Sequence, residues 1–430
     1  MSFKPVQKLN VTRTLSTGDS VQVGVLVQNS QGVFFQYEAQ YLQKFGNLSP
    51  FTLHNSTVLQ PAPAQPHAGL HGVFADSLPD GWGLLLQDRV FRQQGILPAQ
   101  VTAMDRLAFV GSTGTGALAF TPESDLHITS QADTDLATLG LEAQAVFDGQ
   151  TEHVLAALVA AGSSGGARPK AQLFFSADKP SQCCTQAKRG DDAWLVKFTS
   201  QNLALGHEEG LCEAAYLHLA EVADLHPPQW QLLPAPEESG AKAWLAVKRF
   251  DWLQNINSGR PGRLHLHSAC GLLDADFRLP SLDYADLIKA SRQLCKSPSV
   301  GQLQFRRALF NLFACNQDDH SKNWAFLQDD NSQWQPAPFY DVTFSPHPFN
   351  EHTTAFMGYG KQPPLAVIQQ LAGQAGFADW KQAQAHIQES VEALSGFAVI
   401  AKRLGVKKNT ITAIQKILDA CRKENSVLLR

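Results

Sequence analysis

The octapeptide NQDDHSKN at residues 316–323 limits what this chain can fold into more than any other segment does. It directly follows an apolar stretch in which Phe305, Leu309, Leu312 and Phe313 recur at helical spacing. A dense group of charged and hydrogen-bonding side chains is costly to bury without partners. The segment therefore predicts a loop that follows a buried helix and faces a solvated site. An ordinary Asp- and Asn-rich surface turn is the alternative interpretation.

Two residues of this loop, Asp318 and Asn323, have the spacing that protein kinases use in their catalytic loop. In that chemistry the Asp accepts the proton of the substrate hydroxyl, and the Asn oxygen helps to hold Mg²⁺, which prefers oxygen ligands. We therefore expect Asp318 to be the catalytic base and Asn323 a metal ligand. His320 is expected to have a structural role, and Lys322 is expected to contact phosphate.

Asp341 supplies a second candidate metal ligand. It lies in PAPFYDVTFS (336–345), downstream of a predicted strand or hairpin. Kinases place their second metal-binding carboxylate after such a hairpin. Here the tripeptide is Tyr-Asp-Val and not Asp-Phe-Gly. A solvated turn Asp is the alternative.

Lys197 ends the apolar strand-like sequence WLVKF. A buried lysine needs a partner, and Glu213 on the predicted helix 208–223 would supply one. The order of strand lysine and helix glutamate matches the ion pair of protein kinases. Glu208 and Glu209 compete for this role, and a lysine at a strand edge could also extend into water.

The segment GSSGGARPK (162–170) is rich in small residues. The backbone amides around Gly165 and Gly166 could surround phosphate, next to the hydroxyls of Ser163 and Ser164. The segment lacks the GxxxxGK[ST] pattern of a P-loop. A flexible linker would have the same composition.

The distribution of secondary-structure signals predicts an α+β protein with two lobes and a strand-rich N-terminal part. Residues 18–60 are rich in strand-like sequence, for example at 32–42. The segment 78–95 has the pattern of a turn followed by an amphipathic helix. Three further strands are expected at 171–175, 193–198 and 243–250. The chain after residue 251 is mostly helical in pattern, at 281–296, 301–315, 364–375, 380–404 and 409–424. We expect an N-terminal subdomain at 1–125, a kinase N-lobe at 126–250 and a helical C-lobe at 251–430.

Composition narrows the cellular setting. The net charge of −4 argues against a bulk basic surface for nucleic acid. The N-terminus MSFKPVQKLN lacks the apolar stretch of a signal peptide, and no apolar run reaches the ~18 residues of a membrane span. The seven cysteines show no paired spacing and are expected to be reduced thiols. We therefore expect a cytoplasmic protein with no membrane association.

Together these segments resemble the HipA family of bacterial serine/threonine kinases, the toxins of HipBA-type toxin–antitoxin pairs. DSLPDGWG (76–83) and DRLAFVGSTGTGALAF (105–120) resemble the N-terminal subdomain of the family. SSGGARPKAQL (163–173) resembles its phosphate-covering loop, while WLVKF and VKRFD (247–251) resemble its lysine strand and hinge. NQDDHSKN and PFYDV resemble its catalytic and metal loops. The resemblance covers nearly the whole chain.

The resemblance implies a two-lobed serine/threonine protein kinase that uses ATP and Mg²⁺. Lys197 would contact the ATP phosphates. The hinge residues that would meet the adenine are Val247, Lys248, Arg249 and Phe250. In the family a serine of the Gly-rich loop is autophosphorylated, which ejects the loop and switches the kinase off. Ser163 is the best match for that serine and Ser164 is its neighbour.

The resemblance also implies partners. These are a HipB-like helix-turn-helix antitoxin, operator DNA bound mainly through that antitoxin, and a protein substrate, an aminoacyl-tRNA synthetase, whose phosphorylation would arrest growth. LGVKKNTITAIQKIL (404–418) has a faint helix-turn-helix pattern, but we interpret it as a pair of C-lobe helices. Two other functions remain open: a catalytically silent binding module or DNA co-repressor, and a small-molecule kinase.

Overall fold

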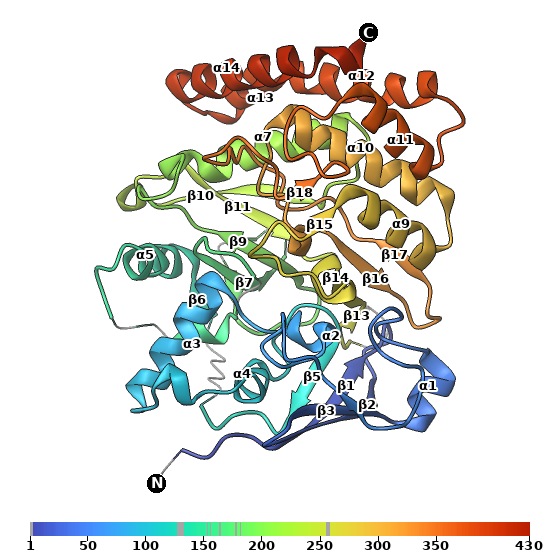
Figure 1. The fold of residues 1–430 in the computed structure, drawn as a ribbon. Helices are drawn as coiled ribbons and strands as arrows, with labels where there is room; N and C mark the ends of the chain where they lie inside the picture. The colour runs from blue at the N-terminus through green and yellow to red at the C-terminus, as the bar shows by residue number, and fades with distance from the viewer. Residues whose placement is uncertain are drawn as a thin grey trace.

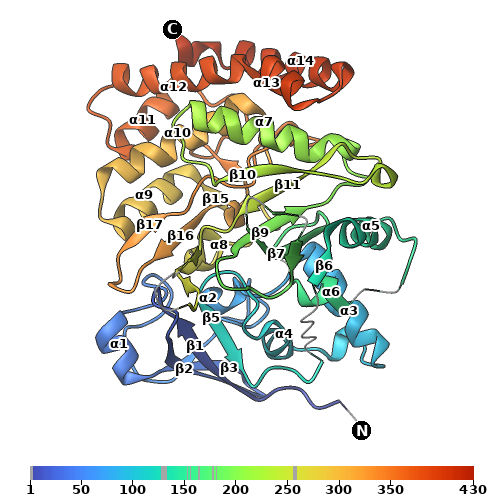
Figure 2. The same cartoon turned by 180° about the vertical axis from the view of Figure 1, so that it is seen from behind.

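The computed structural model describes residues 3–126, 133–152, 154, 156–162, 165–176, 179–180, 182–254 and 259–430. The chain runs from a five-stranded sheet at one end of the molecule to a layer of helices at the other, so its two termini lie far apart (Figure 1). A second, larger sheet lies between these ends, as the view from behind also shows (Figure 2). This arrangement is the predicted two-lobed α+β fold.

The first sheet is antiparallel and has the strand order β4-β3-β2-β1-β5. Its strands are β1 (Lys8–Thr14), β2 (Ser20–Asn29), β3 (Gly32–Tyr37), β4 (Gln60–Pro61) and β5 (Leu118–Thr121). The strand-like sequence 32–42 is a strand only in its first part, because β3 ends at Tyr37 and α1 (Ala39–Phe45) begins two residues later. The helix buries Tyr41 and Phe45, which are four residues apart and so share one helical face.

The second sheet is also antiparallel and forms the N-lobe. Its order is β10-β11-β9-β7-β8-β6. The strands are β6 (Asp133–Asp135), β7 (Lys170–Phe175), β8 (Gln182–Cys184), β9 (Asp192–Lys197), β10 (Trp230–Pro234) and β11 (Ala243–Lys248). Alternate residues of β11 serve two cores: Leu245 packs with α7 (Glu209–Val222), while Trp244 packs with α5 (Leu136–Phe147). The predicted strands at 171–175, 193–198 and 243–250 are therefore confirmed.

One helix packs across the expected boundary near residue 125. Trp82 and Leu86 on α3 (Gly81–Gln93) belong to the core of the second sheet, and Trp82 Nε1 donates a hydrogen bond to the carbonyl of Lys170 at 2.8 Å. By contrast, Leu107 on α4 (Ala103–Val110) packs into the core of the first sheet. The N-terminal part of the chain therefore contributes directly to the lobe that carries the Gly-rich segment.

The C-lobe is mainly helical, as predicted. It contains α9 (Tyr284–Cys295), α10 (Pro298–Ala314), α11 (Leu365–Ala375), α12 (Trp380–Ser395), α13 (Phe397–Leu404) and α14 (Lys408–Glu424). The prediction of one helix over 380–404 is wrong, because Gly396 separates two helices. The lobe also includes a three-stranded sheet of short strands, β14 (His265–Ser268), β16 (Ala325–Gln328) and β17 (Trp334–Pro336). The antiparallel pair β16–β17 is the hairpin predicted upstream of Asp341, whereas β14 was not predicted.

The segment 404–418 forms the end of α13 and most of α14. Ile414 and Leu418 are buried in the C-lobe core, and Phe397 on α13 packs edge-on against Tyr216 at a ring separation of 5.7 Å. The interpretation of this segment as C-lobe helices is therefore confirmed. None of the helices in the described part of the chain has both the length and the apolar character needed to cross a membrane.

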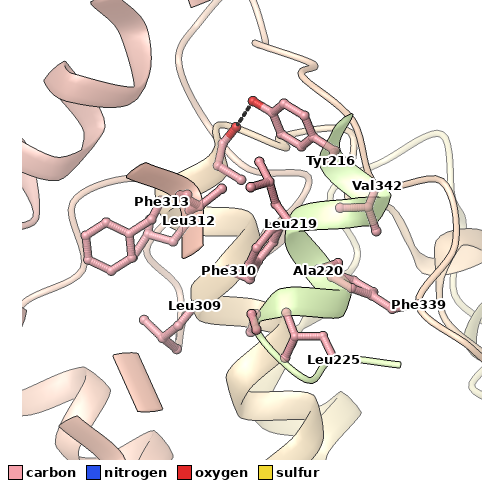
Figure 3. Close-up of a cluster of buried hydrophobic side chains, with 14 of the residues drawn as sticks. Tyr216, Leu219, Ala220, Leu225, Leu309, Phe310, Leu312, Phe313, Phe339 and Val342 are labelled. Atoms are coloured by element: carbon pink, nitrogen blue, oxygen red, sulfur yellow. Dashed lines mark hydrogen bonds between the residues drawn. The ribbon is translucent and has the colours of Figure 1, made fainter. Parts of the chain in front are cut away.

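The core between α7 and α10 connects the two lobes. Leu219 and Phe310 lie face to face across the two helices, with Phe339 and Val342 beside them (Figure 3). Tyr216 Oη donates a hydrogen bond to the carbonyl oxygen of Ala314, the last residue of α10, at 2.9 Å. The polar loop 316–323 starts just after α10, so this hydrogen bond fixes the start of the loop relative to α7.

Candidate active site

The two aspartates of the loop 316–323 differ in exposure. Asp319 is buried, where it accepts hydrogen bonds from Tyr284 Oη at 2.5 Å and from the Thr354 amide at 3.1 Å, with His352 Nδ1 2.8 Å away. The Asp318 side chain is 68% exposed. Asp319 therefore anchors the loop, and Asp318 is the carboxylate that can meet a substrate.

The surroundings of Asp318 suit a proton acceptor. Partial desolvation by the cavity wall and the Asp341 carboxylate raise the pKa of Asp318 above its ordinary value, although His320 opposes this change. Asn323 Nδ2 donates to the Asp318 carbonyl at 2.7 Å. This bond uses the amide nitrogen of Asn323, so its carboxamide oxygen is the atom that could face a cation.

Lys197 lies at the centre of the charged groups. Its Nζ is 2.6 Å from Glu213 Oε1 and also contacts Asp341 Oδ1, so the expected lysine–glutamate ion pair is present. The competing carboxylates have other partners: Glu209 lies 3.1 Å from Arg168, and Glu208 accepts the Lys407 amide. Burial would raise the pKa of Asp341, but Lys197 and the nearby cations hold it well below its ordinary value.

One cavity of about 520 Å³ brings the candidate residues together. Those that line it are Gly165, Gly166, Lys197, Glu213, Val247, Lys248, Arg249, Phe250, Asp318, His320, Lys322, Asn323 and Asp341. The predicted autophosphorylation sites Ser163 and Ser164 lie outside the described residues. Lining a cavity does not assign a role, so the roles of these residues stay predictions.

The predicted hinge residues are held by neighbours. Lys248 forms an ion pair with Asp192 at 2.8 Å, and the Arg249 guanidinium pairs with the buried Asp251. The Phe250 ring lies 5.5 Å from that of Tyr340. Since the charged ends of Lys248 and Arg249 are occupied, contacts from these two residues to an adenine would come from the backbone.

Arg168, Lys170 and Asp80 are among the further charged residues that line the cavity, and the sequence patterns did not identify them as site residues. Arg168 pairs with Glu209 and Glu213, and Lys170 Nζ donates to the Gly165 carbonyl at 2.7 Å. Burial lowers the pKa of Lys170 to about 8. The third residue is Asp80, which contacts Lys322. The signal for Lys170 was its position just before the predicted strand 171–175, while Asp80 lies in DSLPDGWG, a segment that indicated only a resemblance to the N-terminal subdomain.

The donor chemistry of the cavity fits a magnesium–nucleotide complex. Lys170, Lys197 and Lys322 supply positive charge for phosphates, and Asn323 and Asp341 supply oxygen ligands. No group of three or more His, Cys, Asp or Glu residues suited to a metal occurs in the part of the chain that the structure describes. A small set of protein ligands is typical of Mg²⁺, which takes further oxygens from phosphates and water.

Comparisons with known proteins agree with this architecture. The HipA-like C-terminal domain model matches residues 162–398, and the HipA N-terminal domain model matches residues 17–121. A search of curated protein sequences gives no match.

Two solved structures resemble the chain. The first is a chain of the Shewanella oneidensis MR-1 toxin–antitoxin complex of HipA, HipB and operator DNA, with 16% identity, coverage of 96% of this chain and 97% of that chain, and a TM-score of 0.69. The second is the Helicobacter pylori proinflammatory kinase CtkA, with 15% identity, coverage of 62% and 92%, and a TM-score of 0.37. The first shows that the two share a fold. Because the C-terminal model alone spans more than half of the sequence, this chain belongs to the HipA family.

Proposed function

We propose that this chain is a serine/threonine protein kinase that uses ATP and Mg²⁺ and acts as the toxin of a toxin–antitoxin pair. The observation that carries the proposal is the meeting of Lys197, Glu213 and Asp341 in the cavity that Asp318 also lines. Protein kinases use a lysine–glutamate pair, a metal-binding Asp and a catalytic Asp in such an arrangement. Membership of the HipA family supports the same reaction.

Each residue has a defined task in this proposal. Asp318 accepts the proton of the acceptor hydroxyl, and its raised pKa favours that task. Asn323 and Asp341 hold Mg²⁺, which neutralises charge on the phosphates when bound. Lys197 binds phosphate and is oriented by Glu213. The reaction depends mainly on positioning and on fixed charges, so small displacements of these residues should slow it strongly.

We further propose that the acceptor is a serine of a cellular protein, an aminoacyl-tRNA synthetase, and that a HipB-like antitoxin binds the toxin and operator DNA. The Shewanella oneidensis complex, which holds HipA, HipB and operator DNA together, supports this partner set. Autophosphorylation of Ser163 or Ser164 is the proposed off-switch, because a phosphate dianion in the Gly-rich segment would repel ATP.

Phosphoproteomics after brief expression tests this function. Expression of the wild-type chain should produce a new phosphoserine on one cellular protein, and Asp318→Asn should abolish it. Phosphorylation that is identical in the two strains would reject the kinase function. Phosphate transfer to a metabolite instead of a protein would identify a small-molecule kinase.

A further inference from the structure

Asp80 is the residue just before α3, yet its carboxylate reaches into the kinase cavity. Its side chain is 9% exposed, and its Oδ2 lies 2.5 Å from Lys322 Nζ of the catalytic loop. Its Oδ1 accepts a hydrogen bond from the Gly166 amide of the Gly-rich segment. One carboxylate therefore binds two loops that belong to different lobes.

The carboxylate of Asp80 is not used to cap its own helix. An Asp at the N-cap position usually accepts a hydrogen bond from the first turn, which stabilises a helix by ~1 kcal/mol. Asp80 is the N-cap residue of α3, but its side chain makes no capping hydrogen bond. Both of its oxygens instead face the site, at Lys322 and Gly166.

The backbone after Asp80 is shaped to receive Gly166. Gly81 has a positive φ of 41°, and a Cβ atom placed on it would lie 2.7 Å from the Gly166 carbonyl oxygen. The Trp82 amide donates to that same oxygen at 3.0 Å. Only a glycine at position 81 allows this close approach without a clash. Residues 80–82 therefore bind both the N–H and the C=O of Gly166.

The charge on Asp80 is stable at neutral pH. Burial alone would raise the pKa of Asp80, but the Lys322 ammonium and the Gly166 amide outweigh it and keep the pKa below its ordinary value. Lys322 also lies 4.3 Å above the centre of the Phe277 ring. An ammonium held between a carboxylate and an aromatic face has little freedom to turn away from the cavity.

We propose that Asp80 is a positioning residue for phosphoryl transfer: it directs Lys322 toward the phosphates and fixes the backbone of Gly166 at the cavity wall. The N-terminal part of the chain then contributes a residue that positions two groups of the kinase site. The chemistry in this inference rests on the proposed kinase function. The two contacts of Asp80 do not, and they can be tested separately.

Two substitutions separate the contacts. Asp80→Asn keeps an oxygen that can accept the Gly166 amide but removes the charge that binds Lys322, whereas Asp80→Ala removes both. We expect kcat for phosphoryl transfer to fall on the order of 10-fold in Asp80→Asn and up to about 100-fold in Asp80→Ala, because small misplacements near the reacting groups have effects of this size. Asp88→Asn is the matched control, since Asp88 lies on the same helix and pairs with Arg106 at 2.7 Å outside the cavity.

A double-mutant comparison detects an effect that a purely structural role would not produce. If Asp80 acts through Lys322, then Asp80→Asn should change kcat less than twofold when Lys322 is already replaced by Met. An undiminished 10-fold loss in the Lys322→Met background would contradict this part of the proposal.

Hydrogen exchange tests the contact with Gly166 without any nucleotide. The peptide that includes Gly165 and Gly166 should exchange at least several-fold faster in Asp80→Ala than in wild type, while Asp80→Asn and Asp88→Asn stay close to wild type. If wild type transfers no phosphate, the kinase function fails, but faster exchange in Asp80→Ala still supports the structural part. Exchange and kcat that both match wild type in Asp80→Ala would overturn the proposal. If Asp80→Ala does not fold, an unchanged kcat in Asp80→Asn would overturn it instead.

Discussion

Lys197 Nζ lies 2.6 Å from Glu213 Oε1, and this ion pair joins β9 of the N-lobe sheet to α7. The same ammonium contacts Asp341 in the segment that follows β17. A strand, a helix and a loop from the other lobe therefore meet at one buried cation. The position of Lys197 in the cavity depends on all of them.

Replacing Glu213 should impair nucleotide use more than folding. Glu213→Gln keeps the shape of the side chain but removes the charge that orients Lys197. We expect kcat/KM for ATP to fall on the order of 10- to 100-fold, equivalent to about 1.4–3 kcal/mol of lost transition-state stabilisation. Steady-state kinetics with varied ATP measures the loss.

Glu221→Gln is the control for this substitution. Glu221 is on the same helix, and its side chain is 69% exposed. Its replacement should leave kcat/KM within twofold of wild type. Equal losses in both variants would mean that the charge of Glu213 has no particular role.

Nucleotide binding should weaken as the pH rises through about 8. Burial lowers the pKa of Lys170 from 10.5 to about 8, so the folded chain loses this proton well before the unfolded chain does. Between pH 8 and 10.5 the unfolded state holds more protons than the folded state, so the contribution of Lys170 to the free energy of unfolding rises with pH. At neutral pH, below both pKa values, burial of the charged Lys170 lowers the free energy of unfolding by roughly 3 kcal/mol. Phosphates bind the charged form, which is lost above pH 8.

Calorimetry of ATP binding near pH 8 in buffers of different ionisation enthalpy measures this effect. Wild type should take up protons on binding, because phosphate stabilises the charged Lys170. Lys170→Met should bind more weakly at pH 7 and should show little proton uptake. Proton uptake that persists in Lys170→Met would assign it to another group.

The hydrogen bond between Tyr216 and the Ala314 carbonyl should contribute to stability. Tyr216→Phe removes the hydroxyl and leaves a buried carbonyl without its partner, which costs about 1–3 kcal/mol. Urea unfolding should show this loss. Tyr359→Phe is the control, because Tyr359 is 45% exposed and should change stability little. A loss below about 0.5 kcal/mol in Tyr216→Phe would mean that water replaces the bond.

An exposed aromatic residue near the loop 316–323 should help to select the acceptor. Phe349 is 73% exposed, and the segment around it is joined to Gln317, because Gln317 Nε2 donates to Asn350 Oδ1 at 2.9 Å. Asn350, the residue just after Phe349, therefore contacts the residue just before Asp318. A polypeptide acceptor could cover such an apolar side chain.

Phe349→Ser should raise the KM for the protein acceptor on the order of 10- to 100-fold, since fully covering an aromatic side chain contributes about 1.5–3 kcal/mol. The KM for ATP should not change. Val399→Ser is the matched control, because Val399 is 70% exposed on α13. An unchanged KM for the acceptor would place protein recognition elsewhere.

Site residues could be predicted where the residue types needed for phosphoryl transfer coincided with a recognisable local sequence pattern. The spacing from Asp318 to Asn323 distinguished Asp318 from the neighbouring Asp319, and the structure exposes the first and buries the second. Lys197 and Glu213 could be paired because an apolar strand-like sequence and the predicted helix 208–223 placed them on consecutive elements.

Contacts between distant segments could not be predicted in this way. Asp80 and Lys322 are 242 residues apart, and nothing near either residue indicates that they meet. Residues 39–42 carry aromatic and polar residues that suit a strand or a helix, and burial of Tyr41 with Phe45 favours the helix. Tertiary packing determines both the contact between Asp80 and Lys322 and the helical conformation of residues 39–42.

The most direct test of the kinase function is transfer of the γ-phosphate from ATP by the purified protein in the presence of Mg²⁺. Wild type should form phosphoserine, detected by mass spectrometry, and EDTA should prevent it. Asp318→Asn should remain folded and lose the activity by at least about 100-fold, the usual scale for a catalytic base. The exposed Asp286 on α9 provides the control Asp286→Asn, which should match wild type. Undiminished phosphoserine formation in Asp318→Asn would contradict the assignment of the site.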